Sequence, residues 1–270
     1  MKSSEVVVIT GASSGIGLAC VNAFFKAGYK VVAASRSLDI LEKTGLELDP
    51  TGERYFSVKA DVAVENDCKN LIQETIDRFG RIDVLINNAG ITMRALFEET
   101  DLKVMKQIMD VNFWGVVYCT RYAMPYLLKS KGIIVGMSSV AGYKGLPTRS
   151  GYSASKFAVE GFLEAIRIEN LKKGVSILIV RPGFVATNIR NTMMSADGTQ
   201  QGISHKDEGK SMQPEEVASH LLIAVKKRKR TMILSMTAIL SFWLNKFVPA
   251  YVDKQVFRHV ANEKDSPLKD

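Results

Sequence analysis

A tyrosine and a lysine four residues apart form the stretch of this sequence with the clearest capacity for chemistry. Tyr152 and Lys156 lie in the run Gly-Tyr-Ser-Ala-Ser-Lys, near the start of a helix predicted from Ser150 to about Lys173. Positions i and i+4 share one helical face, so the ammonium should lie beside the phenol. A neighbouring positive charge favours the phenolate and predicts a pKa for Tyr152 below its usual value of about 10. Tyr152 is therefore a candidate acid and base near neutral pH, although this spacing also occurs by chance on solvated helices.

A glycine-rich turn after a buried strand is the second candidate site. Residues 5–10 are apolar and β-branched, which predicts a strand, and the run Gly-Ala-Ser-Ser-Gly-Ile-Gly at 11–17 leads from it into a helix that ends at Gly28. Such a turn presents backbone N–H groups to a pyrophosphate at the positive end of the helix dipole. The alternative is a plain tight turn, because the spacing differs from the commoner G-x-G-x-x-G fingerprint.

The end of the second predicted strand, residues 29–35, indicates the type of dinucleotide. In dinucleotide-binding folds this strand end meets the adenosine ribose, about 20 residues past the glycines, and an acidic residue there holds the 2′-hydroxyl of NAD. This sequence instead has Ser35 and Arg36, and an arginine donates two hydrogen bonds to a 2′-phosphate. We therefore expect NADP(H) rather than NAD(H). The alternative is a surface arginine that happens to follow a strand.

Polar or glycine-containing segments also follow the later predicted strands. Each has an alternative when taken alone: Asp61 would hold an adenine amino group or cap the next helix, and Ser139 would be a catalytic or a turn serine. Alternating strands and helices predict a single α/β domain with a Rossmann-like, doubly wound parallel sheet and helices on both faces. Ligands bind such sheets at the carboxyl ends of the strands, so the segments should converge on one site. The strands are predicted at 5–10, 29–35, 54–60, 83–86, 132–137, 175–180 and 231–234. The candidate site segments that follow the first six of them are residues 11–17, 36, 61, 87–90, 139 and 182–183.

Asn112 lies in the middle of a long apolar helix predicted over about 101–129. An amide is unfavourable there, because it competes with the helix for backbone hydrogen bonds. A functional role and a buried structural hydrogen bond both remain open for this residue.

Composition and charge limit the classes of function. The 270 residues are 46% hydrophobic and 24% charged, and no repeat or linker divides them, as in an ordinary soluble globular chain. Three widely separated cysteines, Cys20, Cys68 and Cys119, predict neither a disulfide framework nor a metal site. The net charge of +8 is concentrated partly at 226–230, but no basic helix is interleaved with aromatic residues, so nucleic acid is not expected as a partner. The short apolar run near the N-terminus does not resemble a signal peptide, which predicts a cytoplasmic protein.

The C-terminal part of the chain leaves two interpretations open. We expect a catalytic domain over 1–235, with a substrate flap at about 188–213, and a tail over 236–270. The tail is mostly apolar over 232–252, but polar residues and a proline interrupt it, so it is too short to span a membrane. The preferred interpretation is a strand, a loop and a helix that covers the substrate mouth. The alternative is peripheral membrane contact through 226–252, with the basic run drawn to anionic lipid.

Taken together, these motifs closely resemble the short-chain dehydrogenase/reductase family, in its order and spacing over about residues 5–190. The resemblance implies a sheet of seven strands, a nicotinamide cofactor and no metal. The matching residues are Thr10–Gly17, Asn87–Gly90, Asn112, Ser139, Tyr152, Lys156 and Arg181–Gly183.

The resemblance also implies roles for individual residues. Tyr152 would exchange a proton with the substrate oxygen, and Lys156 would lower its pKa and bind the nicotinamide ribose. Ser139 would hydrogen-bond the substrate oxygen, and Asn112 would hold a water in a proton relay. Around the cofactor, the implied residues are Gly11, Ser13, Ser14, Gly15, Ile16 and Gly17 at the pyrophosphate, Ser35 and Arg36 at the 2′-phosphate, Asp61 and Val62 at the adenine, Asn88, Ala89 and Gly90 on the adenosine side, and Pro182, Gly183, Val185 and Thr187 beside the nicotinamide.

The expected function is NADPH-dependent interconversion of a ketone or aldehyde and an alcohol, on a hydrophobic substrate of lipid or steroid type. Phe184, Ile189, Met193 and Met194 indicate an apolar pocket, although plain packing explains them equally well. The alternative function is a protein that senses NADP(H) without turnover. Because relatives pair the helices corresponding to 101–129 and 150–173, the resemblance implies a homodimer or homotetramer.

Overall fold

A parallel β-sheet forms the centre of the computed structural model, which describes residues 5–190, 192–202, 211–263 and 265–269. The strand order is β3-β2-β1-β4-β5-β6-β7, and every neighbouring pair is parallel. The order reverses between β1 and β4, where parallel α/β sheets open a crevice for ligands. The strands are β1 (Val6–Thr10), β2 (Lys30–Ser35), β3 (Tyr55–Lys59), β4 (Val84–Asn87), β5 (Ile133–Met137), β6 (Ser176–Arg181) and β7 (Thr231–Ile233).

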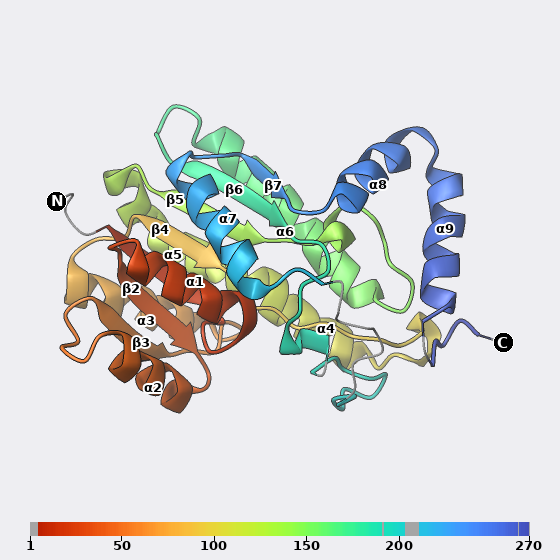
Figure 1. Ribbon diagram of the computed structural model, residues 1–270, viewed down its shortest axis with the longest axis horizontal. Helices are drawn as coiled ribbons and strands as arrows, with labels where there is room; N and C mark the ends of the chain where they lie inside the picture. The colour runs from red at the N-terminus through yellow and green to blue at the C-terminus, as the bar shows by residue number, and fades with distance from the viewer. Residues whose placement is uncertain (1–4, 191, 203–210, 264, 270) are drawn as a thin grey trace.

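Helices cover both faces of this sheet, which confirms the predicted doubly wound α/β fold (Figure 1). The first face packs against α1 and α7, and the second packs against α3, α5 and α6. The helices are α1 (Gly15–Lys26), α2 (Leu38–Leu48), α3 (Glu65–Phe79), α4 (Leu102–Met109), α5 (Gly115–Ser130), α6 (Ser150–Glu169), α7 (Pro214–Lys226), α8 (Met236–Phe247) and α9 (Pro249–Ala261).

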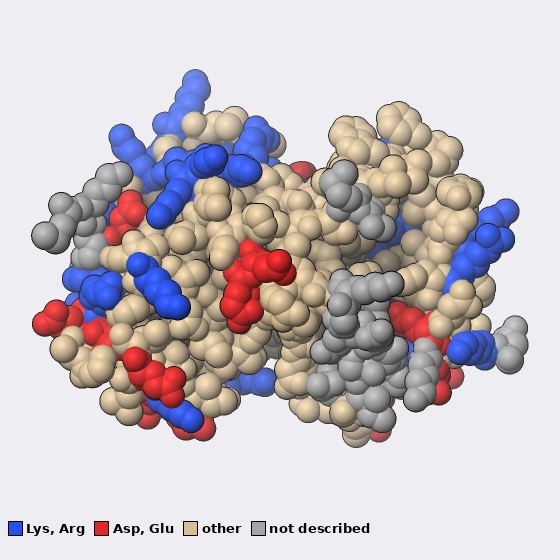
Figure 2. Space-filling view, viewed as in Figure 1, with Lys and Arg blue, Asp and Glu red and all other residues tan. Residues whose placement is uncertain are grey.

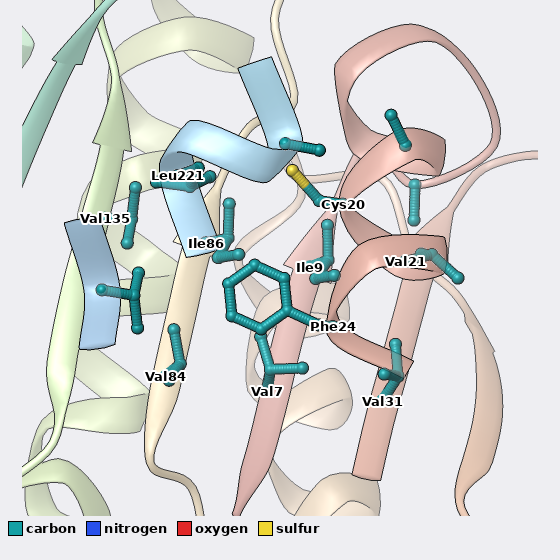
Figure 3. Packing of buried hydrophobic residues seen from close by; sticks show 14 of the residues in the cluster. Val7, Ile9, Cys20, Val21, Phe24, Val31, Val84, Ile86, Val135 and Leu221 are labelled. Atoms are coloured by element: carbon teal, nitrogen blue, oxygen red, sulfur yellow. The ribbon is translucent and has the colours of Figure 1, made fainter. Parts of the chain in front are cut away.

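Alternation of side chains along β1 explains why the sheet is buried on both sides. Val7 and Ile9 belong to the core under α1 and α7, whereas Val6 and Val8 belong to the core on the opposite face. Figure 3 shows the ring of Phe24, from α1, lying over Val7 and Ile9. All five side chains are fully buried, and each contributes about 1.5–3 kcal/mol by leaving water. This burial fixes the strand ends that carry the site.

The long helix predicted over 101–129 is not a regular α-helix. It consists of α4, a π-helical turn at Asp110–Trp114 and α5. The π-helical turn contains Asn112, so the amide lies where the chain departs from α-helical hydrogen bonding. Such turns occur frequently at functional sites.

The tail after β7 forms two helices, α8 and α9, instead of the single helix that we expected. Figure 1 shows both at the right of the view, beside the carboxyl ends of the strands. In the described parts of the chain, no helix has the length and apolar character needed to cross a membrane.

Candidate active site

The carboxyl end of β5 and the first turns of α6 bring the hydroxyl groups of Ser139 and Tyr152 together. The Ser139 hydroxyl lies close enough to the phenol of Tyr152 to lower its pKa, and its Oγ accepts a 3.2 Å hydrogen bond from the backbone N–H of Ala141. Lys156 follows one turn later on α6, with its Nζ 5.6 Å from the centroid of the Tyr152 ring. These three predicted catalytic residues therefore lie in one place.

The acidity of Tyr152 differs from the prediction. Burial raises the pKa of Tyr152 above its ordinary value of 10, while the hydrogen bond from Ser139 and the positive charge of Arg149 act in the opposite direction. The prediction that Lys156 lowers this pKa is wrong for the arrangement described. The Lys156 ammonium instead donates a 2.8 Å hydrogen bond to the carbonyl oxygen of Met137.

Lys156 is itself strongly affected by its surroundings. Burial lowers the pKa of Lys156 to about 8, and the negative charge of Glu160, one turn further along α6, opposes this fall. An amine with a pKa near 8 can change its charge state within the range in which enzymes commonly work. The lysine is therefore buried and held in place rather than spread along the helix surface.

Asn112 is fully buried and joins three parts of the site. Its Oδ1 accepts a 2.8 Å hydrogen bond from the N–H of Ile91, and its Nδ2 donates 2.9 Å hydrogen bonds to the Ile91 carbonyl and to the Ser155 hydroxyl. Both amide protons are thus engaged. The structural hydrogen bond that we had left open for Asn112 is present, and it ties the loop after β4 to α6.

The glycine turn after β1 has the shape that a pyrophosphate requires. Gly11 and Gly15 have φ values of +64° and +53°, which side chains other than glycine rarely adopt. A Cβ on Gly17 would lie 2.1 Å from the carbonyl oxygen of Gly11. Ser14 precedes α1, and its side chain makes no capping hydrogen bond. The N-terminal N–H groups of α1 therefore lie beside a turn whose glycines permit a close approach to the backbone, which fits a dinucleotide phosphate.

Hydrogen bonds hold this turn against the loop after β4. Thr10 Oγ1 accepts hydrogen bonds from the N–H groups of Asn88 and Ala89, at 3.0 and 3.1 Å. Asn88 Nδ2 donates to the carbonyls of Thr10 and Gly11, at 2.9 and 3.2 Å. Asn88 and Ala89 therefore shape the crevice wall, whereas Gly90 lies close to both Asn112 and Lys156.

The residues predicted around the adenosine lie at the ends of β2 and β3. Ser35 accepts a 3.1 Å hydrogen bond from the N–H of Ser37, and the exposed side chain of Arg36 makes no hydrogen bond or ion pair with the residues that the structure describes. Asp61 accepts a hydrogen bond from the N–H of Ala63 at 3.0 Å. It therefore forms a local turn, and it does not cap α3, which begins only at Glu65. The neighbouring Val62 is buried.

The segment after β6 approaches the same crevice from the other side. Val185 is buried, and the methyl group of Thr187 would lie 3.2 Å from a Cβ placed on Gly15. Gly183, after Pro182, lies close to Ser235, where its own Cβ would come within 2.9 Å. Thr187 therefore lies beside the glycine turn. Within the described residues no cluster of histidine, cysteine or carboxylate side chains could hold a metal.

Comparison with known families agrees with this geometry. A family model described as short chain dehydrogenase matches residues 5–198. The chain belongs to the short-chain dehydrogenase/reductase family. Its members are oxidoreductases that act on alcohol and carbonyl groups with a nicotinamide cofactor.

Individual relatives are similar over most of the chain. Dehydrogenase/reductase SDR family member 7B of Mus musculus is 34% identical over 86% of this chain and 73% of its own length. The 11-beta-hydroxysteroid dehydrogenase A of Sesamum indicum is 41% identical over 69% of this chain and 54% of its own length. An alcohol dehydrogenase from the archaeon Thermococcus sibiricus, solved in complex with 5-hydroxy-NADP, has a TM-score of 0.74 and 28% identity, with 86% of this chain and 95% of that chain covered.

The segment of this short-chain dehydrogenase/reductase that was predicted as a flap, 188–213, pairs with the loop after β4 through Met194. The N–H of Arg94 donates to the carbonyl of Met194 at 2.9 Å, and the N–H of Met194 donates to the carbonyl of Thr92 at 3.0 Å. Met193 and Met194 are buried, and Met194 packs with Met93 and neighbouring apolar residues. Packing therefore accounts for Met194, and part of the predicted flap, 203–210, lies outside the described residues.

A buried ion pair beside the catalytic residues was missed from the sequence. The Glu160 carboxylate accepts hydrogen bonds from the Ser138 hydroxyl at 2.6 Å and from Arg181 Nε and Nη2 at 2.8 and 2.5 Å. Ser138 adjoins Ser139, and Glu160 lies one turn after Lys156. The available signal was the i+4 spacing from Lys156 to Glu160, which predicts a shared helical face.

The tail helices contact the segment between Ser139 and Tyr152. The Tyr143 hydroxyl lies 3.0 Å from the Ser241 hydroxyl, and Tyr143 and Phe242 pack edge to face at 5.1 Å. Lys144 forms an ion pair with Asp253. These contacts fix the tail against the segment that joins Ser139 to Tyr152.

Proposed function

We propose that this short-chain dehydrogenase/reductase uses NADPH to interconvert a hydrophobic ketone or aldehyde and the corresponding alcohol. The observation that carries the proposal is that Ser139, Tyr152 and Lys156 lie together at the carboxyl edge of a sheet whose first strand ends in a turn with left-handed glycines. When bound, the nicotinamide supplies or accepts the hydride. The residues of the chain supply orientation and the proton.

Tyr152 is the proton donor in carbonyl reduction. Because its pKa is raised, the phenol is protonated at neutral pH and ready to donate to the oxygen that becomes an alkoxide. Ser139 donates a hydrogen bond to the same oxygen and stabilises its developing charge. In alcohol oxidation the phenol must first lose its proton, so the raised pKa favours the reductive direction at neutral pH.

Lys156 and Asn112 support the reaction of the Tyr152 phenol without being its proton donor. Lys156 holds the nicotinamide ribose and keeps a positive charge near the site. Asn112 fixes the loop after β4 to α6, and the remaining lone pair of its Oδ1 is available to a water in the proton relay.

The experiment that tests the catalytic assignment is Tyr152→Phe, which should abolish NADPH oxidation with a panel of carbonyl compounds and leave NADPH binding nearly intact. Turnover retained by this variant would overturn the mechanism.

The preference for NADP(H) over NAD(H) rests on Arg36. Its exposed guanidinium has no partner among the described residues and follows the strand end that meets the adenosine ribose, so it is available to a 2′-phosphate. We expect kcat/KM to be higher with NADPH than with NADH, and Arg36→Gln to remove most of the difference. A clear NADH preference in the native enzyme would reject this assignment.

A protein that senses NADP(H) without turnover is the second function. It needs the crevice but has no use for the paired hydroxyls of Ser139 and Tyr152. NADPH binding without oxidation of the cofactor by any carbonyl compound in the panel would favour it.

The proposal that the substrate is hydrophobic depends on the exposed apolar surface of the tail helices. Leu240, Trp243 and Phe247 recur along one face of α8 and are 60%, 52% and 76% exposed. We propose that this face touches a membrane surface in a protein that otherwise works in the cytoplasm. Figure 2 shows the uncharged surface of α8 at the upper right and a cluster of lysine and arginine near the end of α7 at the upper left. Liposome co-sedimentation of the native protein and of Trp243→Ser tests the contact, and equal binding of the two would argue against this face.

We also propose that the enzyme is a homodimer or homotetramer. Trp114, immediately before α5, and Phe157, on α6, are 43% and 46% exposed, and a second copy would cover them. Light scattering of the native protein tests this directly, and a monomer at micromolar concentration would exclude it.

A further inference from the structure

Two residues of the basic run at 226–230, Arg228 and Arg230, play no part in the proposed reaction and line a cavity at the opposite edge of the sheet. This cavity, of about 200 Å³, lies where α7 ends and the amino ends of β6 and β7 begin. Arg167, Arg228 and Arg230 line it, together with Leu171 and residues 174–177. We call it the arginine cavity.

Backbone carbonyl groups hold two of these guanidinium groups in place. Arg167 is buried in α6, and its Nη2 donates to the carbonyls of Ile177 and Arg230 at 3.4 and 3.1 Å. Arg228 donates from Nε to the Ser176 hydroxyl at 2.8 Å, and its Nη2 lies within hydrogen-bond distance of the carbonyls of Lys131, Gly132 and Gly174, at 2.7, 3.0 and 2.7 Å. All of these acceptors are neutral, so the two positive charges are positioned without being neutralised.

The cavity consequently holds an excess of positive charge. No carboxylate lines it, and the exposed side chain of Arg230 forms no hydrogen bond or ion pair with the described residues. Burial lowers the pKa of Arg167, and the charge of Arg230 lowers it further, whereas Glu164 on the outer side of α6 acts in the opposite direction. Like charges held this close destabilise one another, and a bound anion would relieve that repulsion.

We propose that the arginine cavity binds a phosphate group. Guanidinium groups recognise phosphate oxygens through their N–H donors. The Nε and Nη2 groups of Arg167 and Arg228 are engaged by the protein, which fixes both side chains, and their Nη1 groups make no hydrogen bond with the described residues. These Nη1 groups, together with the guanidinium of Arg230, are available to the ligand. A water occupies about 30 Å³, so the cavity has room for a phosphate and several waters. Figure 2 shows the surrounding lysine and arginine side chains gathered at the upper left. The phosphate belongs either to a lipid headgroup or to a soluble phosphate compound.

Arg230→Gln is the decisive variant, because its side chain stabilises no described part of the fold. Lys229→Gln is the matched control: it removes the same charge at an exposed neighbouring position that does not line the cavity. Arg36→Gln is the second control, because inorganic phosphate would also bind the proposed cofactor crevice.

In the first arm, the melting temperature of each protein is measured with increasing inorganic phosphate, with chloride at matched ionic strength as reference. Phosphate should stabilise the native protein, and Arg230→Gln should weaken its apparent affinity about tenfold, which corresponds to about 1.4 kcal/mol. Lys229→Gln should retain the affinity. Loss of the effect in Arg36→Gln alone would assign the phosphate to the cofactor crevice and overturn the proposal.

In the second arm, binding is measured to vesicles that contain phosphatidic acid and to vesicles of phosphatidylcholine alone, at physiological ionic strength. Binding to the acidic vesicles that Arg230→Gln loses and Lys229→Gln keeps identifies a lipid headgroup. Phosphate binding in solution without vesicle binding identifies a soluble phosphate compound. Equal losses for Arg230→Gln and Lys229→Gln would reveal diffuse charge attraction and refute a defined cavity, as would the absence of any dependence on Arg230.

Discussion

Glu160→Gln should expose the importance of the ion pair behind the catalytic residues. The native carboxylate accepts three hydrogen bonds, from Ser138 and from two nitrogens of Arg181, at 2.5–2.8 Å. The amide keeps the volume but loses the charge and leaves the buried guanidinium of Arg181 unpaired. Removing one partner of a buried pair costs about 3–5 kcal/mol, so the urea midpoint should fall sharply.

The same substitution should change the pH dependence of the reaction. The charge of Glu160 raises the pKa of Lys156, which burial lowers to about 8. Without that charge the pKa of Lys156 falls, so the lysine loses its proton at a lower pH. If the charged lysine is required, activity is present below this pKa and lost as pH rises through it. The alkaline limb of the kcat/KM profile should therefore move to lower pH.

Glu164→Gln is the matched control for this experiment. Glu164 lies one turn further along α6 and is exposed, so its loss should change the free energy of unfolding by less than about 0.5 kcal/mol and leave the pH profile unchanged. The double substitution Glu160→Gln/Arg181→Met should recover part of the stability, because no unpaired charge remains. If Glu160→Gln and Glu164→Gln unfold at the same urea concentration, the ion pair does not have the role argued for it.

Three further predictions concern the site itself. Ser139→Ala should lower kcat about 10²–10³-fold by removing a hydrogen bond to the developing oxyanion, and steady-state kinetics with an unchanged kcat would reject that role. In carbonyl reduction, the activity that remains above the Lys156 limb should be lost in a second limb, as pH rises through the raised pKa of Tyr152. Ser139→Ala should move this second limb to higher pH, since Ser139 lowers the pKa of Tyr152, and a limb displaced to lower pH would contradict the assignment. Gly17→Ala should abolish NADPH binding in calorimetry, because its Cβ would lie 2.1 Å from the Gly11 oxygen. In the control Gly28→Ala, the added Cβ meets no atom within 4 Å, so the substitution should cost only the roughly 1–2 kcal/mol of a left-handed backbone. Unchanged NADPH binding by Gly17→Ala would show that the turn can relax.

The sequence was sufficient to predict the sheet and the edge at which the site forms. Strands and glycine turns are local patterns, and parallel strands place their carboxyl ends together, so Gly11, Ser139 and Tyr152 could be assigned to one edge before the structure was known. The anomaly of an amide at Asn112 was also visible, and the structure resolves it with a π-helical turn.

What depends on burial and on distant partners could not be predicted in this way. The i+4 spacing put Lys156 on the correct face of α6 but could not reveal that its ammonium bonds Met137, so the direction of the Tyr152 pKa shift was wrong. The partners of the tail were equally hidden, because Tyr143 and Ser241 are 98 residues apart. A local apolar pattern did not distinguish a pocket from packing at Met194, which belongs to a buried cluster.

The number of residues in the π-helical turn at Asp110–Trp114 sets how α4 is rotated about its axis relative to α5. An α-helix advances by about 100° for each residue, so deleting one residue there would restore ordinary helical spacing at the expense of rotating α4 relative to α5. Either the apolar stripe of one helix would leave its core, or Asn112 would swing away from Ile91 and Ser155. Substitutions at many positions of these helices should therefore be tolerated among homologues. A homologue that lacks one residue of the π-helical turn should instead be inactive.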